Sequence, residues 1–128
     1  MRVDAAAGRR LVEDLLASRQ RIMVGAARAV DDSAERGAAT ARANARQTSG
    51  THGRHYPRSI TWDRLTVPDG VAAEFGPDAS KKQGSMGAGF EYGSVNQTTP
   101  HLDNNRAADA EEPRFLAAVN GVLSRELG

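Results

Sequence analysis

Two histidines three residues apart, His52 and His55, are the residues of this sequence whose spacing most resembles that of metal ligands. Imidazole is a common ligand of zinc, but a zinc site needs three or four protein ligands. No carboxylate or third histidine is close to the pair, since His101 lies far along the chain. The sequence therefore predicts no metal site and no cofactor, and the pair is more simply part of an exposed loop.

Candidates for phosphate binding and catalysis lack the context that such chemistry needs. Residues 84–89 are rich in glycine, but a phosphate-binding loop links a strand to a helix, and this segment precedes an expected strand. Ser85, Ser94 and Ser124 lack the surroundings of a nucleophile elbow, and no pair of carboxylates stands out from the charged faces. The absence of cysteine excludes disulfides, thiolate metal sites and cysteine catalysis. We expect no catalytic residues and no enzyme, and a toxin-like or hydrolytic enzyme is the weakest hypothesis.

Basic residues interleaved with an aromatic residue occupy positions 46–58. They are Arg46, His52, Arg54, His55, Tyr56 and Arg58. Such a composition is typical of surfaces that bind nucleic acid, so a small DNA-binding protein that uses the loop from Arg46 to Arg58 is one functional hypothesis. The total charge opposes it, because 17 basic and 16 acidic residues leave a formal charge of only +1. A solvated loop or a protein interface is the simpler interpretation.

A long segment at about 9–45, with a stripe of apolar residues, precedes the candidate residues described so far and is the element that must position them. Apolar or small side chains recur there with the three-and-four spacing of one helical face. They are Leu11, Val12, Leu15, Leu16, Ile22, Met23, Ala26, Ala27, Val30, Ala34, Ala38, Ala41 and Ala45. A continuous helix of this length spans roughly 55 Å, whereas a compact domain of this size is about 35 Å across. The helix therefore either breaks at Gly25 or Gly37 and folds back, or stays long and buries its overhang against another subunit.

Strand signals follow the long helix. Residues 58–67 form an expected strand, and a change in the parity of its apolar residues predicts a bulge near Asp63 and Arg64. Residues 68–70 have the chemistry of a tight turn, and residues 71–75 form a second strand antiparallel to the first.

A third strand is expected after a glycine-punctuated loop at 76–85. Its apolar residues Met86, Ala88, Phe90 and Tyr92 share one parity. The expected fold class is therefore α+β, with a long N-terminal helix, a small antiparallel sheet of three or four strands and a C-terminal helix.

The ends of the chain complete this scheme. Asp4 is an expected cap for the first helix, and residues 94–100 form an expected loop. Asp103 is expected to cap a short turn that reaches Ala110, and Pro113 fits the first turn of the last helix. That helix aligns Phe115, Leu116, Val119, Val122, Leu123 and Leu127 on one face.

At 128 residues the chain is one domain with a modest core. The expected map is a long helix at 1–46, a loop at 47–57, a sheet at 58–95 and a helical C-terminal segment at 101–127, within a single domain 1–128. With 39% hydrophobic residues and a mean hydropathy of −0.54, it looks less able than most domains to stand alone. No apolar run approaches the roughly 18 residues of a membrane span, and no signal-peptide core is present. We expect a protein made and kept inside a cell, with no membrane partner.

The order of motifs from residue 48 to 127 resembles the neck or tail-completion (head-to-tail joining) proteins of long-tailed bacteriophages and their prophage relatives. The matching segments are Ser49-Gly50, Tyr56-Pro57-Arg58-Ser59-Ile60, Phe90-Glu91-Tyr92-Gly93-Ser94, Pro100-His101-Leu102 and Arg106-Ala107-Ala108. The chain departs from the family pattern by inserting residues 51–55, and by having Leu102 where the family has Pro-Phe.

The resemblance implies a structural virion protein rather than an enzyme. It implies a homo-oligomeric ring, with a hexamer favoured, between the capsid connector or stopper and the tail tube or terminator. DNA would pass through the lumen without sequence-specific binding. The expected location is the head–tail junction of the virion, after assembly in the host cytoplasm. Tail completion, tail termination and a capsid-side stopper all fit this pattern.

A ring of this kind needs heterologous contacts between subunits. We expect them at the alanine-rich end of the long helix and at the 76–85 loop, because both are poor at burying themselves. Glu91, opposite Phe90 and Tyr92 on the expected strand, is expected to pair with an arginine within or between subunits. The candidate interface residues are Ala38, Ala41, Arg54, Arg58, Lys81, Lys82 and Glu91.

Overall fold

The computed structural model describes residues 5–93 and 100–128. The expectations for Asp4 and for the loop at 94–99 lie outside these residues. In chain order the elements are α1 (Ala5–Thr48), α2 (Tyr56–Ser59), β1 (Ile60–Leu65), β2 (Ala72–Pro77), a short 3-10 helix η1 (Gly84–Met86), α3 (Gly87–Tyr92) and α4 (Asp103–Leu127). The fold is α+β, as the sequence predicts, with long helices near both ends.

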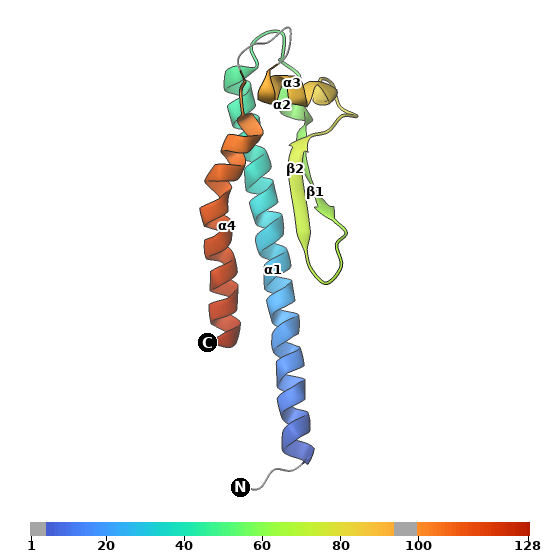
Figure 1. Ribbon diagram of the computed structural model, residues 1–128, viewed down its shortest axis with the longest axis vertical. Helices are drawn as coiled ribbons and strands as arrows, with labels where there is room; N and C mark the ends of the chain where they lie inside the picture. Colours follow the sequence, from blue (N-terminus) through green and yellow to red (C-terminus); the bar gives the residue numbers. More distant parts are fainter. Residues whose placement is uncertain (1–4, 94–99) are drawn as a thin grey trace.

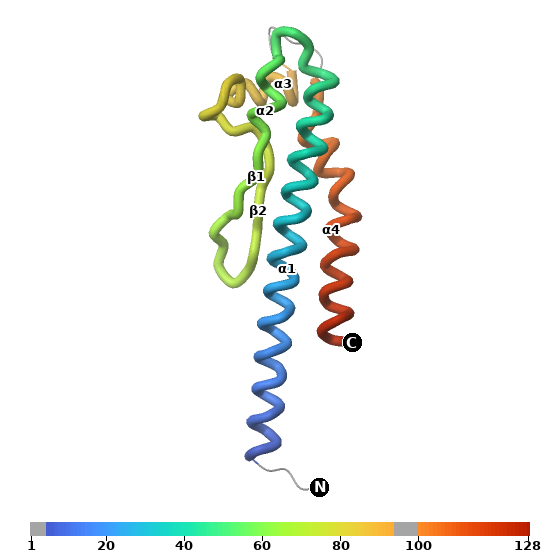
Figure 2. The backbone as a smooth tube through the Cα atoms, turned by 180° about the vertical axis from the view of Figure 1, so that it is seen from behind, coloured from blue at the N-terminus to red at the C-terminus, as the bar shows by residue number. Residues whose placement is uncertain are grey.

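The long helix α1 is continuous over 44 residues, or roughly 66 Å, and it organises the molecule. Helix α4 runs antiparallel along one side of α1, and the β1–β2 hairpin lies along another (Figures 1 and 2). Neither Gly25 nor Gly37 breaks the helix. A Cβ on Gly25 would lie 2.8 Å from Val122 Cγ1, and one on Gly37 would lie 2.4 Å from Phe75 Cε1. These glycines therefore allow α4 and β2 to approach closely.

The hairpin pairs β1 with β2 without interruption, from Ile60 opposite Pro77 to Leu65 opposite Ala72. The bulge predicted near Asp63 and Arg64 is wrong. Ile60 and Trp62 have even positions and Leu65 has an odd one, so in a regular strand the side chain of Leu65 points to the other face. No bulge is needed to turn it inward, because Leu65 is 42% exposed.

The third strand is also a wrong prediction, since residues 84–92 are helical and the described residues contain a two-stranded sheet. In a strand Phe90 and Glu91 would point to opposite faces, but in α3 both turn inward. Phe90 stacks on Tyr56 at 4.5 Å between ring centroids, and Glu91 is 4% exposed. The backbone N–H of His101 donates to Phe90 O, so the end of α3 also binds the chain that leads into α4. These tertiary contacts override the alternating pattern.

Helix α4 is one helix from Asp103 to Leu127, so the predicted short turn and separate last helix are wrong. Pro113 lies inside it rather than in its first turn. Proline has no N–H group, so the carbonyl of Asp109, four residues earlier, lacks its helical hydrogen bond. Pro113 and Asp109 are both exposed, so this carbonyl lies on the solvent side of the helix.

The hydrophobic core lies beside the second half of α1. Its fully or nearly buried members are Ala38, Ala41, Ala45, Tyr56, Ile60, Phe90 and Ala107, with Trp62 and Phe75 packed against them. Small alanine side chains let the aromatic rings come close to the α1 backbone. This half of α1 is therefore covered by its own chain.

Candidate assembly surface

The N-terminal part of α1 extends past every other described element (Figure 1). Arg21 Nε lies 2.7 Å from Glu126 Oε2, so residue 21 marks the level at which α4 ends. Residues 5–20, here called the projecting segment, continue for roughly 24 Å. Four large apolar side chains, the apolar stripe, lie on it: Leu11 (61% exposed), Val12 (55%), Leu15 (62%) and Leu16 (58%).

The apolar stripe occupies one face of the projecting segment, because Leu11 and Leu15, and likewise Val12 and Leu16, are four residues apart, and Val12 and Leu15 are three apart. Arg9 lies three residues before Val12, and Arg19 lies three residues after Leu16, so both arginines flank the same face and both are exposed. Contiguous exposed apolar surface of this kind marks interaction sites in soluble proteins. The stripe is thus the first candidate contact surface.

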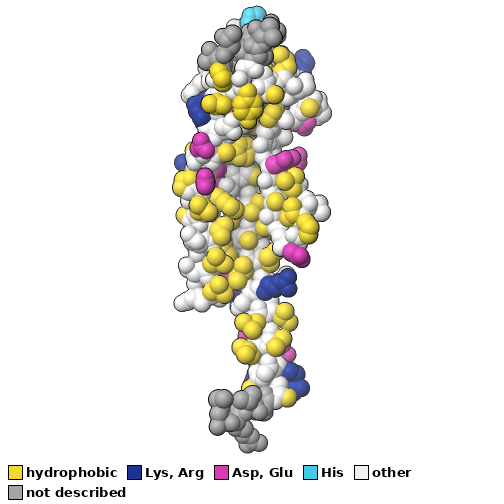
Figure 3. Space-filling view, in the orientation of Figure 1, with side chains coloured by type: hydrophobic (Ala, Val, Ile, Leu, Met, Phe, Trp, Pro, Cys, Tyr) yellow, Lys and Arg dark blue, Asp and Glu magenta, His cyan; other side chains and the backbone are white. Residues whose placement is uncertain are grey.

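A groove on the body of the molecule is the second candidate. Its floor is α1 at Val30, Ser33 and Ala34; its walls are Val71, Ala72, Ala73 and Phe75 on the hairpin side and Phe115 on the α4 side. The hollow measures about 320 Å³. Figure 3 shows hydrophobic side chains gathered along a strip between α4 and the hairpin, with acidic side chains on both flanks.

An ion pair fixes the α4 wall of the groove to its α1 floor. Arg36 Nε and Nη2 donate to the two Glu111 oxygens at 3.0 and 3.2 Å, and Ser33 Oγ donates to Glu111 Oε2 at 2.7 Å. Burial opposes ionisation of Glu111, but the hydrogen bonds from Arg36 and Ser33 outweigh it, so the pKa of the carboxyl lies below its ordinary value. Glu111 is therefore a buried anion that joins the two helices.

Contacts to α1 also hold the hairpin wall in place. Arg42 Nη1 donates to the Ile60 carbonyl at 2.8 Å, and Arg64 donates from Nε and Nη2 to the two carboxylate oxygens of Asp31. The two contacts attach the beginning and the far part of β1, so the groove has two fixed walls.

A buried polar cluster sets the start of α4. Glu91 accepts hydrogen bonds from the backbone N–H groups of Asn104 and Asn105 at 2.9 and 2.8 Å. These are N–H groups that the first turn of a helix cannot pair internally, so Glu91 acts as a cap supplied from α3. Asp103, which is fully buried, accepts a hydrogen bond from Thr48 Oγ1 at 2.9 Å and binds Arg106 at 3.0 Å. The cluster ties α3 and the end of α1 to α4.

Three of the predicted interface residues are buried within the chain's own fold. Ala38 and Ala41 are 0% exposed and belong to the core, so neither leaves surface for a neighbour. Their small size is what allows Tyr56 and Phe90 to cover them. Glu91 is 4% exposed and, among the described residues, receives its hydrogen bonds from Asn104 and Asn105 rather than from an arginine.

The four basic residues of the prediction, Arg54, Arg58, Lys81 and Lys82, are exposed. Burial, and then the charges of Lys82, Arg54 and Arg58, lower the pKa of His55. Arg54 Nε donates a hydrogen bond to His55 Nε2 at 3.2 Å. The side chain of Gln83 joins the two segments, accepting from His55 N at 2.8 Å and donating to the His52 carbonyl. The structure thus brings Lys82 to the basic loop, a proximity that sequence spacing does not show.

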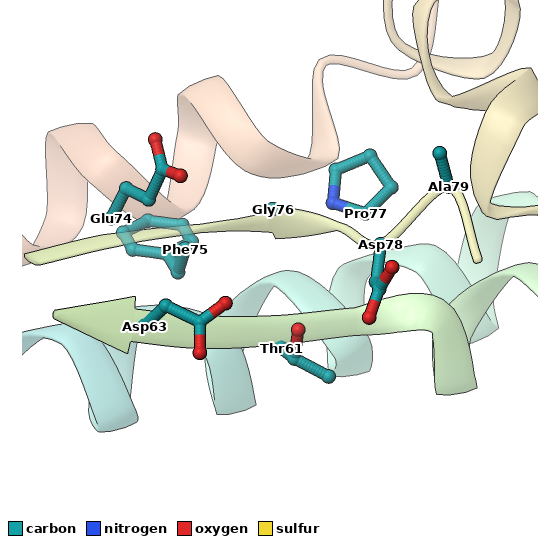
Figure 4. Close-up of a pocket in the computed structure, with 8 residues that line it drawn as sticks. All are labelled: Thr61, Asp63, Glu74, Phe75, Gly76, Pro77, Asp78 and Ala79. Atoms are coloured by element: carbon teal, nitrogen blue, oxygen red, sulfur yellow. The ribbon is translucent and has the colours of Figure 1, made fainter. Parts of the chain in front are cut away.

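A second pocket, of about 360 Å³, lies on the hairpin and shares Phe75 with the groove (Figure 4). Three carboxylates line it, those of Asp63, Glu74 and Asp78; in Figure 4, Thr61 lies between Asp63 and Asp78. Asp63 and Glu74 are cross-strand partners, an arrangement of like charges that is unfavourable without a cation. Within the described ranges, no three histidine or acidic side chains are arranged to hold a metal ion.

Sequence reasoning predicted an overhang of the long helix as one alternative, but it placed the contact at the alanine-rich end and missed the groove. The apolar residues of the stripe were visible as a helical pattern, but which part of that pattern the chain itself covers depends on where α4 and the hairpin end. No family model, no curated protein and no solved structure matches this chain. None of the described helices is both long and apolar enough to cross a membrane.

Proposed function

We propose that this chain is a structural subunit that assembles with copies of itself into a ring at the head–tail junction of a long-tailed bacteriophage. The observation that carries the self-assembly is the apolar stripe on the projecting segment, whose four side chains are each more than half exposed. Burying a leucine or valine gains about 1.5–3 kcal/mol, so covering this stripe is a substantial driving force for association.

The place in the virion rests on the motif order that resembles neck and tail-completion proteins. In that role the ring, with six copies favoured, connects the capsid connector or stopper to the tail tube or terminator, and DNA passes through its lumen. The buried carboxylates of the described residues, Glu91, Asp103 and Glu111, accept hydrogen bonds that join α1, α3 and α4. This use of buried charge supports a structural role rather than a catalytic one.

The test is the mass of the full chain by light scattering after size exclusion, alone and with purified connectors or tail tubes. We expect a ring-sized species in at least one condition, and its loss in Leu15→Glu. Ala17→Glu, which places the same charge on the other side of the projecting segment, is the matched control and should assemble normally. A monomer in every condition contradicts the proposal.

A DNA-binding role is a second candidate, favoured by the hydrogen bonds that join Gln83, the residue after Lys82, to His52 and His55 of the basic loop. Binding through Arg54, Arg58 and Lys82 would weaken steeply with salt, with a slope of about 0.9 per phosphate contact. Replacing Arg58 and Lys82 by glutamine should then reduce the slope. Affinity for duplex DNA that does not depend on these residues contradicts this candidate.

A further inference from the structure

We propose that the projecting segment of one copy occupies the groove of a second copy, so that each contact joins two different surfaces of the chain. This inference rests on the proposed self-assembly and names its contact. The projecting segment supplies Leu11, Val12, Leu15 and Leu16, and the groove supplies the apolar floor and walls described above.

The shape of the groove suits a helix. It lies along α1 between two roughly parallel walls, α4 and the hairpin (Figures 1 and 3). Ser33 and Ala34 on its floor are small, which allows the axis of a third helix to come close to α1. Phe75 and Phe115 on the walls offer apolar surface to leucine side chains.

The groove cannot be filled by the projecting segment of the same copy. Leu15 and Val30 lie on one uninterrupted helix, roughly 22 Å apart along its axis. No turn within α1 allows the segment to fold back over the floor. A second copy of the chain carries the same stripe, and its helix is not joined to the floor of this groove. A second copy can therefore fill the groove.

Charge favours this occupant. The projecting segment has three arginines, Arg9, Arg10 and Arg19, against two acidic residues, Glu13 and Asp14. The hairpin wall has the opposite balance, because residues 60–77 have three acidic residues and one arginine. That arginine, Arg64, is already bound to Asp31. On α4, by contrast, Asp103, Glu111 and Glu126 are themselves paired with arginines. The two arginines that flank the stripe thus meet a hairpin wall of opposite net charge.

The same charges oppose the symmetric alternative, in which two projecting segments pair with each other. An antiparallel pair centred near residue 14 would place Arg9 of one copy beside Arg19 of the other, and like charges would meet at both ends. The contact between stripe and groove avoids this repulsion. Because it joins two different surfaces, it leaves one copy with a free groove and the other with a free stripe, and it can repeat until a ring closes.

Thiol cross-linking tests the contact, since the chain has no cysteine of its own. Leu15→Cys, on the stripe, and Val71→Cys, on the groove wall, are made in separate chains and mixed with a short bismaleimide. We expect cross-linked dimers in the mixture and essentially none from either variant alone. Ala17→Cys mixed with Val71→Cys is the matched control and should lose the product.

Two other results overturn the inference in distinguishable ways. Dimers formed by Leu15→Cys alone would show that stripes pair with each other, which contradicts the groove contact but leaves self-assembly intact. If light scattering shows assembly but no cross-link forms between the Leu15→Cys and Val71→Cys chains, the groove contact is likewise contradicted and self-assembly is left intact. A wild-type chain that stays monomeric under all conditions contradicts the self-assembly itself.

A complementation experiment gives an independent readout. Leu15→Glu removes the stripe but keeps the groove, and Val71→Glu removes the groove wall but keeps the stripe. Each variant alone should be monomeric, and an equal mixture should form a dimer that grows no further. If Val71→Glu alone assembles as well as the wild type, the groove is not the contact.

Discussion

Arg21 donates a hydrogen bond of 2.7 Å to Glu126, and this pair joins α1 to the last turn of α4. The two side chains are 56% and 22% exposed, so the pair itself contributes only about 0–1 kcal/mol. The pair marks a boundary on α1: on one side of it the helix is covered by α4 and the hairpin, and on the other side residues 5–20 extend past every other described element.

Changes in the projecting segment and in the covered part of α1 should differ in their effect on the stability of the monomer. Leu15→Ala, in the exposed half, should change the free energy of unfolding of the monomer by less than about 0.5 kcal/mol. Ala41→Leu, in the core, should destabilise by about 1–3 kcal/mol because the site is full. Urea unfolding at low protein concentration measures both. A large loss in Leu15→Ala under these conditions would mean that the stripe is covered within the monomer.

Concentration dependence provides a companion prediction for the stripe. If copies associate through it, the unfolding midpoint of the wild type rises with protein concentration. Leu15→Glu should abolish this rise, whereas Ala17→Glu should preserve it. A midpoint that is independent of concentration in the wild type speaks against association in the tested range.

Gly37→Ala should destabilise although alanine favours helix formation. The added Cβ would lie 2.4 Å from Phe75 Cε1, so we expect a loss of about 1–3 kcal/mol from overpacking. Gly8→Ala is the matched control, since its Cβ would have no atom within 4 Å. It should be neutral or stabilising by up to about 1 kcal/mol. Equal effects at both positions would refute the close packing of β2 on α1.

Glu91→Gln tests the cap that α3 supplies to α4. Glutamine keeps one acceptor oxygen but loses the charge, so we expect a loss of about 1–3 kcal/mol in the free energy of unfolding. Glu112→Gln, at an exposed position of α4, should change it by less than about 0.5 kcal/mol. Similar urea midpoints for the two variants would argue against the cap.

Glu111 should give the protein an acid-sensitive contribution to stability. Its pKa in the folded state lies below the ordinary value of 4.5, so the folded state binds the proton less readily than the unfolded chain does. The contribution is therefore fully present above the unfolded pKa and is lost as the pH falls through the folded pKa. Glu111→Gln should destabilise at about pH 7 by about 1–3 kcal/mol. It should also flatten the decline in stability below about pH 5, whereas Glu112→Gln should keep it. An unchanged acid decline in Glu111→Gln would contradict the role of its ion pair with Arg36.

Local sequence patterns were enough to predict the long N-terminal helix, the hairpin and the C-terminal helix. Helix α1 is predictable because its apolar residues keep a helical period over many turns, and β1 and β2 because a Pro-Asp-Gly turn joins two short apolar runs. These features depend on neighbours in the chain. The end of the sheet was not predictable in this way: residues 84–92 alternate like a strand, but the stacking of Phe90 on Tyr56 and the cap formed by Glu91 require a helix.

The sequence determined that α1 has an apolar side longer than one domain can cover. Only the tertiary structure decided which end of this apolar side is exposed to solvent. The alanines at 38, 41 and 45 are covered because small side chains admit Tyr56, Ile60 and Phe90, whereas the leucines at 11, 15 and 16 are exposed because α4 ends at the level of Arg21. Burial depends on where distant segments end in space, and no local pattern in the sequence records that.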